Sequence, residues 1–293
     1  MAQINANGIS LEVEEQGPTH GEPLILIRGL GTQLVYWPDA FLDGLAEVGC
    51  RVITFDNRDV GKSQRCPKEG VVDDAMGIIE RFHDGKPLDA AYTLDDMALD
   101  VVGLMDALGI DSAHIFGISM GGGIAQLLAI NQPQRCRSVT IVMSAARFSV
   151  GSAIEKLLAW PCTRDQFAEA LIAMEKEWGS PGYPMDDETV RDIAHRAYDR
   201  GYDPNGINRH ALATSQSPDH SQRLKEISLP CTVIHGSDDT LIPPIAGAEI
   251  ASLIPDCPFH QIDGMGHTIT AALTPVIVPL VAQTMARAKT AAD

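Results

Sequence analysis

A serine that could act as a nucleophile lies near the middle of the chain. Ser119 is the centre of Gly-Ile-Ser-Met-Gly at 117–121, which follows an apolar run of strand length and leads into a segment of helical pattern. Glycines on both sides of a serine let a strand turn sharply into a helix, and this turn leaves the hydroxyl exposed above the strand end. Serines also commonly cap helices, so the motif alone leaves that structural role open.

A serine hydroxyl is a weak nucleophile at neutral pH, so it needs a base and a third group that orients the base. Of the nine histidines, His267 is the best placed, because Gly264-Met-Gly266 carries the chain from the last predicted strand into a loop at the sheet edge. Asp238 and Asp239 follow another predicted strand, and spacing alone does not choose between them. The sequence therefore predicts a triad of Ser119, His267 and one of these aspartates.

Apolar runs of strand length alternate with segments of helical period along much of the chain. The predicted strands are 24–27, 52–55, 114–116, 139–143, 231–234 and 259–262. An Asn7-Gly8 pair between alternating polar and apolar residues predicts a tight hairpin before them. Strands that alternate with helices indicate an α/β fold with a mostly parallel central sheet and helices on both faces.

Helical period outside the serine segment is clearest at 93–108, 165–177, 186–198 and 275–292. Thr93 begins the first of these with a capping-box-like pattern, and Gly109 ends it. Between 145 and 229 the strand pattern fails. We therefore predict a helical cap at 146–228, inserted into an α/β core formed by 1–145 and 229–293.

The 293-residue chain carries 39 acidic and 22 basic residues, a formal net charge of −17, and 45% of its residues are hydrophobic. The negative field disfavours nucleic acid and anionic membrane surfaces as partners. The N-terminus lacks the basic and apolar regions of a signal peptide, and no apolar run reaches the roughly 18 residues of a membrane span. We expect a cytoplasmic protein with neither a membrane nor a nucleic acid as partner.

Two glycine-containing stretches approach cofactor motifs without meeting their spacing. Gly61-Lys62-Ser63 ends like a phosphate-binding loop, but Asp56 stands where the first glycine is required. Gly29-Leu-Gly31 follows a predicted strand but lacks the third glycine of a dinucleotide-binding motif. The six cysteines include no Cys-x-x-Cys pair, and the histidines and carboxylates of the predicted cap lack metal-ligand spacing. We expect an enzyme without cofactor or metal.

The chain resembles the α/β-hydrolase superfamily from its first hairpin to its last helix. The likeness rests on Gly-Ile-Ser-Met-Gly at 117–121, on Gly-x-x-Asp-x-x-x-Pro at 236–243 and on Gly-His at 266–267. The loop at 56–63 resembles the family pattern D-x-R-G-x-G-x-S, with Asp59 in place of a glycine. The resemblance implies the order Ser, Asp, His, and hence Asp239 as the triad acid.

Three segments together resemble the branch of this superfamily that contains methyl esterases of polyketide antibiotics. They are Trp-Pro-Asp-Ala-Phe at 37–41, the 56–63 loop and Gly-Met-Gly-His at 264–267.

The resemblance also assigns donors for the oxyanion that develops during acyl transfer. They are the backbone N–H groups of Met120 and Leu30. Relatives usually have His-Gly before the second donor, whereas this chain has Arg28 there. Met143 and Leu241 are expected near the nucleophile as an apolar pocket, although Met143 could equally be buried core.

These residues predict a serine esterase that acts on a small-molecule ester. Ser119 attacks the ester carbonyl, His267 takes the hydroxyl proton, and Asp239 holds the imidazolium. A cofactor-free perhydrolase or haloperoxidase, a lactonase or a carbon–carbon bond hydrolase would use the same triad. A ligand sensor on the same fold would need no turnover.

Overall fold

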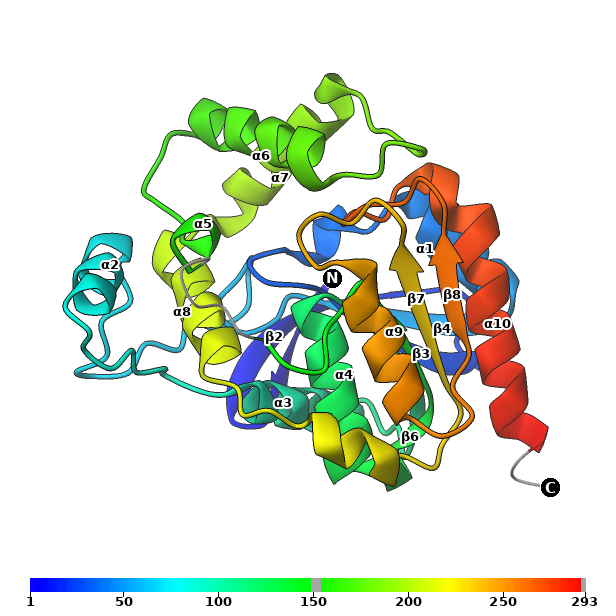
Figure 1. Ribbon diagram of the computed structural model, residues 1–293. Helices are drawn as coiled ribbons and strands as arrows, with labels where there is room; N and C mark the ends of the chain where they lie inside the picture. The colour runs from blue at the N-terminus through cyan, green and yellow to red at the C-terminus, as the bar shows by residue number, and fades with distance from the viewer. Residues whose placement is uncertain (149–153, 291–293) are drawn as a thin grey trace.

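A mixed sheet of eight strands forms the centre of the computed structural model, which describes residues 1–148 and 154–290 (Figure 1). The strands are β1 (Ala2–Ala6), β2 (Ile9–Gln16), β3 (Glu22–Ile27), β4 (Cys50–Phe55), β5 (Ala113–Ile118), β6 (Cys136–Val142), β7 (Cys231–Gly236) and β8 (Phe259–Ile262). Their order is β1-β2-β4-β3-β5-β6-β7-β8. Strands from β4 to β8 pair in parallel, while β2 pairs antiparallel with β1 and β4. The predicted α/β class and mostly parallel sheet are confirmed.

The antiparallel edge begins with the predicted hairpin. Ala6 pairs with Ile9 across a two-residue loop, in which Asn7 and Gly8 have φ angles of 50° and 77°. Two successive positive φ values are those of a type I′ turn, whose twist matches that of paired strands. The Asn-Gly signal was therefore sufficient to place this turn.

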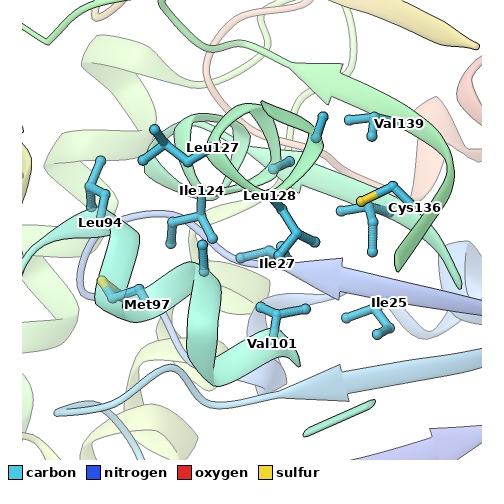
Figure 2. Close-up of a cluster of buried hydrophobic side chains, with 14 of the residues drawn as sticks. Ile25, Ile27, Leu94, Met97, Val101, Ile124, Leu127, Leu128, Cys136 and Val139 are labelled. Atoms are coloured by element: carbon cyan, nitrogen blue, oxygen red, sulfur yellow. The ribbon is translucent and has the colours of Figure 1, made fainter. Parts of the chain in front are cut away.

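Helices cover both faces of the sheet. Successive apolar side chains of a central strand point to opposite faces, so both faces need a cover. Ile25 and Ile27 of β3 pack with α3 (Leu94–Ala107) and α4 (Met120–Asn131) on one face, and Figure 2 shows them beside Val101 and Ile124. Leu24 and Leu26 belong to the cluster on the other face, under α1 (Asp39–Glu47) and α10 (Thr274–Thr290). A strand buried on both faces reads as a continuous apolar run, which is the pattern of parallel sheets.

Several helix boundaries follow their sequence signals. Thr93 caps α3 in a capping box with Asp96, and Gly109 has a φ of 68° directly after that helix. The predicted helix at 275–292 is α10, and its last two predicted residues lie outside the described part of the chain. Outside the segment between β6 and β7, the other described helices are η1 (Leu34–Tyr36), α2 (Ala75–His83), η2 (Pro133–Arg135), α9 (Pro244–Leu253) and η5 (Ala271–Leu273).

The C-terminal helix α10 is rich in apolar residues. Among the described residues, one helical stretch, Ala271–Lys289, has the length and composition that a membrane span requires. In this structure it lies against the sheet, with Ile277 and Val281 buried in the cluster that it shares with α1. Here the segment serves as one of the helices that cover the core.

Helices fill the segment between β6 and β7. They are α5 (Ile154–Leu157), α6 (Arg164–Trp178), α7 (Asp187–Gly201), α8 (Pro204–Ser215) and η4 (Ser221–Glu226). The predicted helices at 165–177 and 186–198 are α6 and α7, which lie beyond the end toward which the strands β7 and β8 point (Figure 1). The boundaries 146–228 for a separate cap remain a prediction.

Ion pairs with buried carboxylates tie these inserted helices to the loop after β4. Arg200 of α7 contacts Asp56, and Arg209 of α8 contacts Asp59, each at 2.6 Å. Asp59 has a φ of 72°, the left-handed conformation for which glycine is favoured. The aspartate at the family's glycine position thus adopts the glycine conformation and adds a carboxylate that pairs with Arg209.

Candidate active site

The turn between β5 and α4 holds Ser119 at a positive φ, with φ 53° and ψ −123°. The glycines around it have no room for a side chain: a Cβ at Gly117 would lie 2.2 Å from the carbonyl oxygen of Gly121, and one at Gly121 would lie 2.3 Å from that of Ile27. A non-glycine residue in this region costs about 1–3 kcal/mol. The Ser119 side chain makes no capping hydrogen bond to α4, which leaves its hydroxyl for another partner.

That partner is the imidazole of His267, in the loop after β8. The distance from Ser119 Oγ to His267 Nε2 is 2.9 Å, and the distance from His267 Nδ1 to Asp239 Oδ2 is 2.7 Å. Asp239 follows β7, so three loops at the carboxyl ends of parallel strands supply the three groups. Asp238 is exposed and accepts a hydrogen bond from Ser237 Oγ. Of the two neighbouring aspartates, the structure brings Asp239 to the histidine.

The environment of Asp239 favours its ionised form. Burial alone would raise the pKa of this carboxyl. Hydrogen bonds with His235 and His267, the charge of His267 and a hydrogen bond from the Ile242 backbone N–H outweigh burial and hold the pKa at about 2. Its Oδ1 accepts from the backbone N–H groups of Leu241 and Ile242, at 3.0 and 2.8 Å. Hydrogen bonds to a carboxylate stabilise its charged state. Asp239 therefore carries a negative charge throughout the neutral range.

The lowered pKa of Asp239 predicts a pH-dependent contribution to stability. Because folding favours the ionised carboxylate, the contribution is fully present above the ordinary value of 3.8 and is lost as the pH falls toward about 2. Between about pH 6 and about pH 3, the unfolding free energy of wild type should fall by roughly 1 kcal/mol more than that of Asp239→Asn. Urea unfolding at both pH values measures this, with Asp238→Asn as the control. Equal pH dependence in wild type and Asp239→Asn would contradict it.

Two backbone amides lie beside the nucleophile. Met120 is the first residue of α4, so its N–H has no partner within the helix. Leu30 follows Gly29, where a Cβ would lie 3.5 Å from Ser119 Oγ. Within the described chain, neither amide donates to a carbonyl outside regular elements. The role of these two amides as oxyanion donors is taken up below as a proposal.

Close backbone packing behind the nucleophile gives a further prediction. Gly121→Ala would force a methyl group against the carbonyl oxygens of Ile27 and Arg28, at 2.3 and 2.6 Å. The strand β3 and helix α4 would have to separate, and we expect a loss of about 1–3 kcal/mol in unfolding free energy. Hydrolytic activity should fall with it, because Met120 and Leu30 would move apart. Ser252→Ala, at an exposed position on α9, provides the control for thermal unfolding.

The two expected pocket residues lie in different environments. Met143 has no exposed surface and belongs to the core cluster with Phe116 and Ile234. Leu241 keeps partial exposure, and its amide holds Asp239. The structure thus places Met143 in the core, which was the other role open to it, and leaves Leu241 beside the triad.

A segment at the end of α6 contacts the histidine loop on both sides of His267. The buried Ser180 accepts a hydrogen bond from Gly266 N–H at 3.0 Å and donates to the carbonyl of Thr268 at 2.6 Å. The backbone N–H of His267 donates to the carbonyl of Trp178 at 2.6 Å. Sequence reasoning missed these contacts, because they join positions more than eighty residues apart and no local pattern marks them.

A serine, a histidine and a buried aspartate in hydrogen-bonded sequence, at the carboxyl ends of a parallel sheet, are the arrangement of a serine hydrolase. The α/β hydrolase fold family model matches residues 22–171. The chain belongs to the α/β-hydrolase family, and it is a hydrolase.

Similar proteins span nearly the same length and differ in substrate. The chain is 24% identical to a rhodomycin D methylesterase of Streptomyces sp. strain C5, over 97% of both chains. It is 26% identical to a 2-hydroxy-6-oxononadienedioate/2-hydroxy-6-oxononatrienedioate hydrolase of Paraburkholderia phymatum, over 84% of this chain and 81% of that protein. The structure of the enol-lactonase from Burkholderia xenovorans LB400 shares the fold, with a TM-score of 0.75, 23% identity and coverage of 97% and 100%.

Proposed function

We propose that the protein hydrolyses carboxylic esters through an acyl-enzyme formed on Ser119. The observation that carries this proposal is the continuous hydrogen-bonded chain from Ser119 Oγ through His267 to Asp239, at 2.9 and 2.7 Å. The similarity to a methylesterase over 97% of the chain supports an ester as the substrate. A serine nucleophile forms an acyl ester that water can release, which is the chemistry that ester hydrolysis needs.

The hydrogen bonds of the triad support the following proton transfers. Ionised Asp239 accepts the Nδ1–H of His267, so Nε2 of the neutral imidazole is free to accept the hydroxyl proton of Ser119. Attack of Oγ on the ester carbonyl forms a tetrahedral intermediate, and the resulting imidazolium then donates its proton to the leaving alcohol. Water enters, loses a proton to the same Nε2 and attacks the acyl carbon. The carboxylic acid leaves, and the hydroxyl of Ser119 is restored.

The amides of Leu30 and Met120 are proposed to receive the oxyanion. Backbone donors are held by the fold before the reaction, so they stabilise the developing charge without reorganisation. The proposed donor is the backbone N–H of Leu30, so the replacement of the usual histidine by Arg28 does not remove it. Loss of one such donor typically lowers the rate by about 10²- to 10³-fold.

A lactone is the second candidate substrate. Lactones are cyclic esters, so the same steps open the ring and release a single hydroxy acid. The similarity in fold to an enol-lactonase and a sequence relative named 3-oxoadipate enol-lactonase 1, from Acinetobacter baylyi, at 26% identity, favour its inclusion. The triad does not distinguish the two substrates, because the difference lies in the pocket around it.

A substrate panel tests the proposal. Methyl, ethyl and p-nitrophenyl esters of short and long acids would be compared with simple lactones under the same conditions. We expect turnover of at least one ester series, with one equivalent of acid and one of alcohol released. Release of peracid in hydrogen peroxide at the expense of ester hydrolysis, or tight binding of every ester without turnover, would contradict the proposal.

A further inference from the structure

The side chain of Arg28 is a buried cation without an acidic partner. The residue is 8% exposed, and its Nε donates to Thr32 Oγ1 at 3.3 Å. Among residues 1–148 and 154–290, no carboxylate oxygen lies within 4.0 Å of its guanidinium. Burial of a charge is strongly unfavourable unless a counter-charge or hydrogen bonds compensate it.

Other arginines with little exposed surface show what such compensation looks like. Arg58, Arg200 and Arg209 pair with Asp100, Asp56 and Asp59 respectively, each at 2.6 Å. Each of these carboxylates is itself almost fully buried. Among the residues that the structure describes, these guanidinium groups each have an acid beside them and Arg28 has none, so the missing counter-ion is a local feature of this position.

Aromatic rings compensate the Arg28 charge in part. Its Cζ lies 4.5 Å from the ring centroid of Trp37 and 5.6 Å from that of Tyr36. Burial lowers the pKa of Arg28 to about 10, and Tyr36 acts weakly in the opposite direction, so the group remains charged at neutral pH. Rings that stack on a guanidinium leave its N–H edge available, and this edge matches the two oxygens of a carboxylate.

The terminal nitrogens of Arg28 retain access to solvent. They form no hydrogen bond within the described chain, and they are not fully enclosed, in contrast to Trp37 Nε1, which is enclosed without a partner. The residue follows the last residue of β3 and precedes Gly29, where a Cβ would lie 3.5 Å from Ser119 Oγ. A cation with open donor positions therefore belongs to the residue directly before Gly29, two positions before Leu30 in the sequence.

We propose that Arg28 binds a carboxylate of the substrate, so that the ester cleaved at Ser119 also carries a free acid group, as a half-ester of a dicarboxylic acid does. This inference rests on the proposed ester hydrolysis. The substrate carboxylate supplies a negative charge beside the Arg28 guanidinium. It also fixes one end of the substrate, while the ester carbonyl lies between Ser119 Oγ and the amides of Leu30 and Met120.

The kinetic test compares substrates that differ only in this charge. Monomethyl succinate, glutarate and adipate would each be paired with the corresponding methyl ester monoamide, which has the same shape and no charge. We expect wild type to prefer the charged member of at least one pair in kcat/KM. Arg28→Met should reduce that preference by about 10²-fold, Arg28→Lys should retain part of it, and the exposed Arg196→Met should leave it unchanged.

A binding experiment separates this inference from the proposed hydrolysis. Calorimetric titration of Ser119→Ala protein with the same pairs does not depend on turnover. We expect the half-ester to bind at least tenfold more tightly than its monoamide, and the difference to vanish in Ser119→Ala/Arg28→Met. Equal binding of both members to Ser119→Ala protein, or an undiminished preference in Arg28→Met, would overturn the assignment. Loss of hydrolysis with this binding difference intact would contradict only the proposed function.

Discussion

Replacement of Ser119 by alanine should lower kcat for ester hydrolysis by about 10⁴- to 10⁶-fold, with little change in KM. The hydroxyl oxygen is the atom that forms the acyl bond, and no other side chain occupies its position 2.9 Å from His267 Nε2 in the described part of the chain. Binding of the substrate depends on other groups and should persist. Steady-state kinetics on the best ester of the substrate panel measure both constants.

The control for this variant is a serine outside the site. Ser252 is exposed on α9 and donates to the carbonyl of Glu249, so Ser252→Ala should keep wild-type kinetics. Thermal unfolding would verify that Ser119→Ala is folded. Turnover within a factor of ten of wild type in folded Ser119→Ala would exclude Ser119 as the nucleophile.

The second large effect is expected from Asp239→Asn. Asparagine keeps the shape of the side chain but can present an N–H to His267 Nδ1, which favours the tautomer with a proton on Nε2. That tautomer cannot accept the proton of Ser119, and the imidazolium loses its counter-charge. In a comparable triad this change lowers kcat by about 10⁴-fold.

Asp238 gives a matched control for the second variant, because it is adjacent in sequence and exposed. Asp238→Asn should retain near-wild-type kcat. Asp239→Asn should recover activity in part at high pH, where hydroxide replaces the lost base function. A large loss in Asp238→Asn with full activity in Asp239→Asn would reverse the assignment of the acid.

Much of the fold could be predicted because its signals are local. The alternation of buried residues in β3 and the Asn7-Gly8 pair each act within a few residues, and the structure confirms the elements that they predict. The helix α8 was not predicted individually, although it lies within the predicted helical cap. Its residues Asn208, Arg209 and His210 are buried and polar, so the helix lacks an apolar stripe, and its partners lie in distant loops.

The site also contains residues that local sequence identifies and residues that only the tertiary structure identifies. Ser119 and His267 follow strands in glycine-containing turns, so their sequence neighbours identify them. The choice between Asp238 and Asp239 depends on the direction of two adjacent side chains in one loop, which spacing does not encode. The environment of Arg28 also depends on tertiary structure, because the sequence around an arginine does not indicate whether a carboxylate lies near it in space.

The central claim is that an acyl group is carried by Ser119. Wild-type protein would be mixed with p-nitrophenyl acetate, quenched in acid within milliseconds and digested, and the acetylated peptide would be identified by mass spectrometry. We predict a burst of nitrophenol with acetate on Ser119, and neither burst nor adduct in Ser119→Ala. A burst with acetate on another residue, or an equal burst in Ser119→Ala, would contradict the claim.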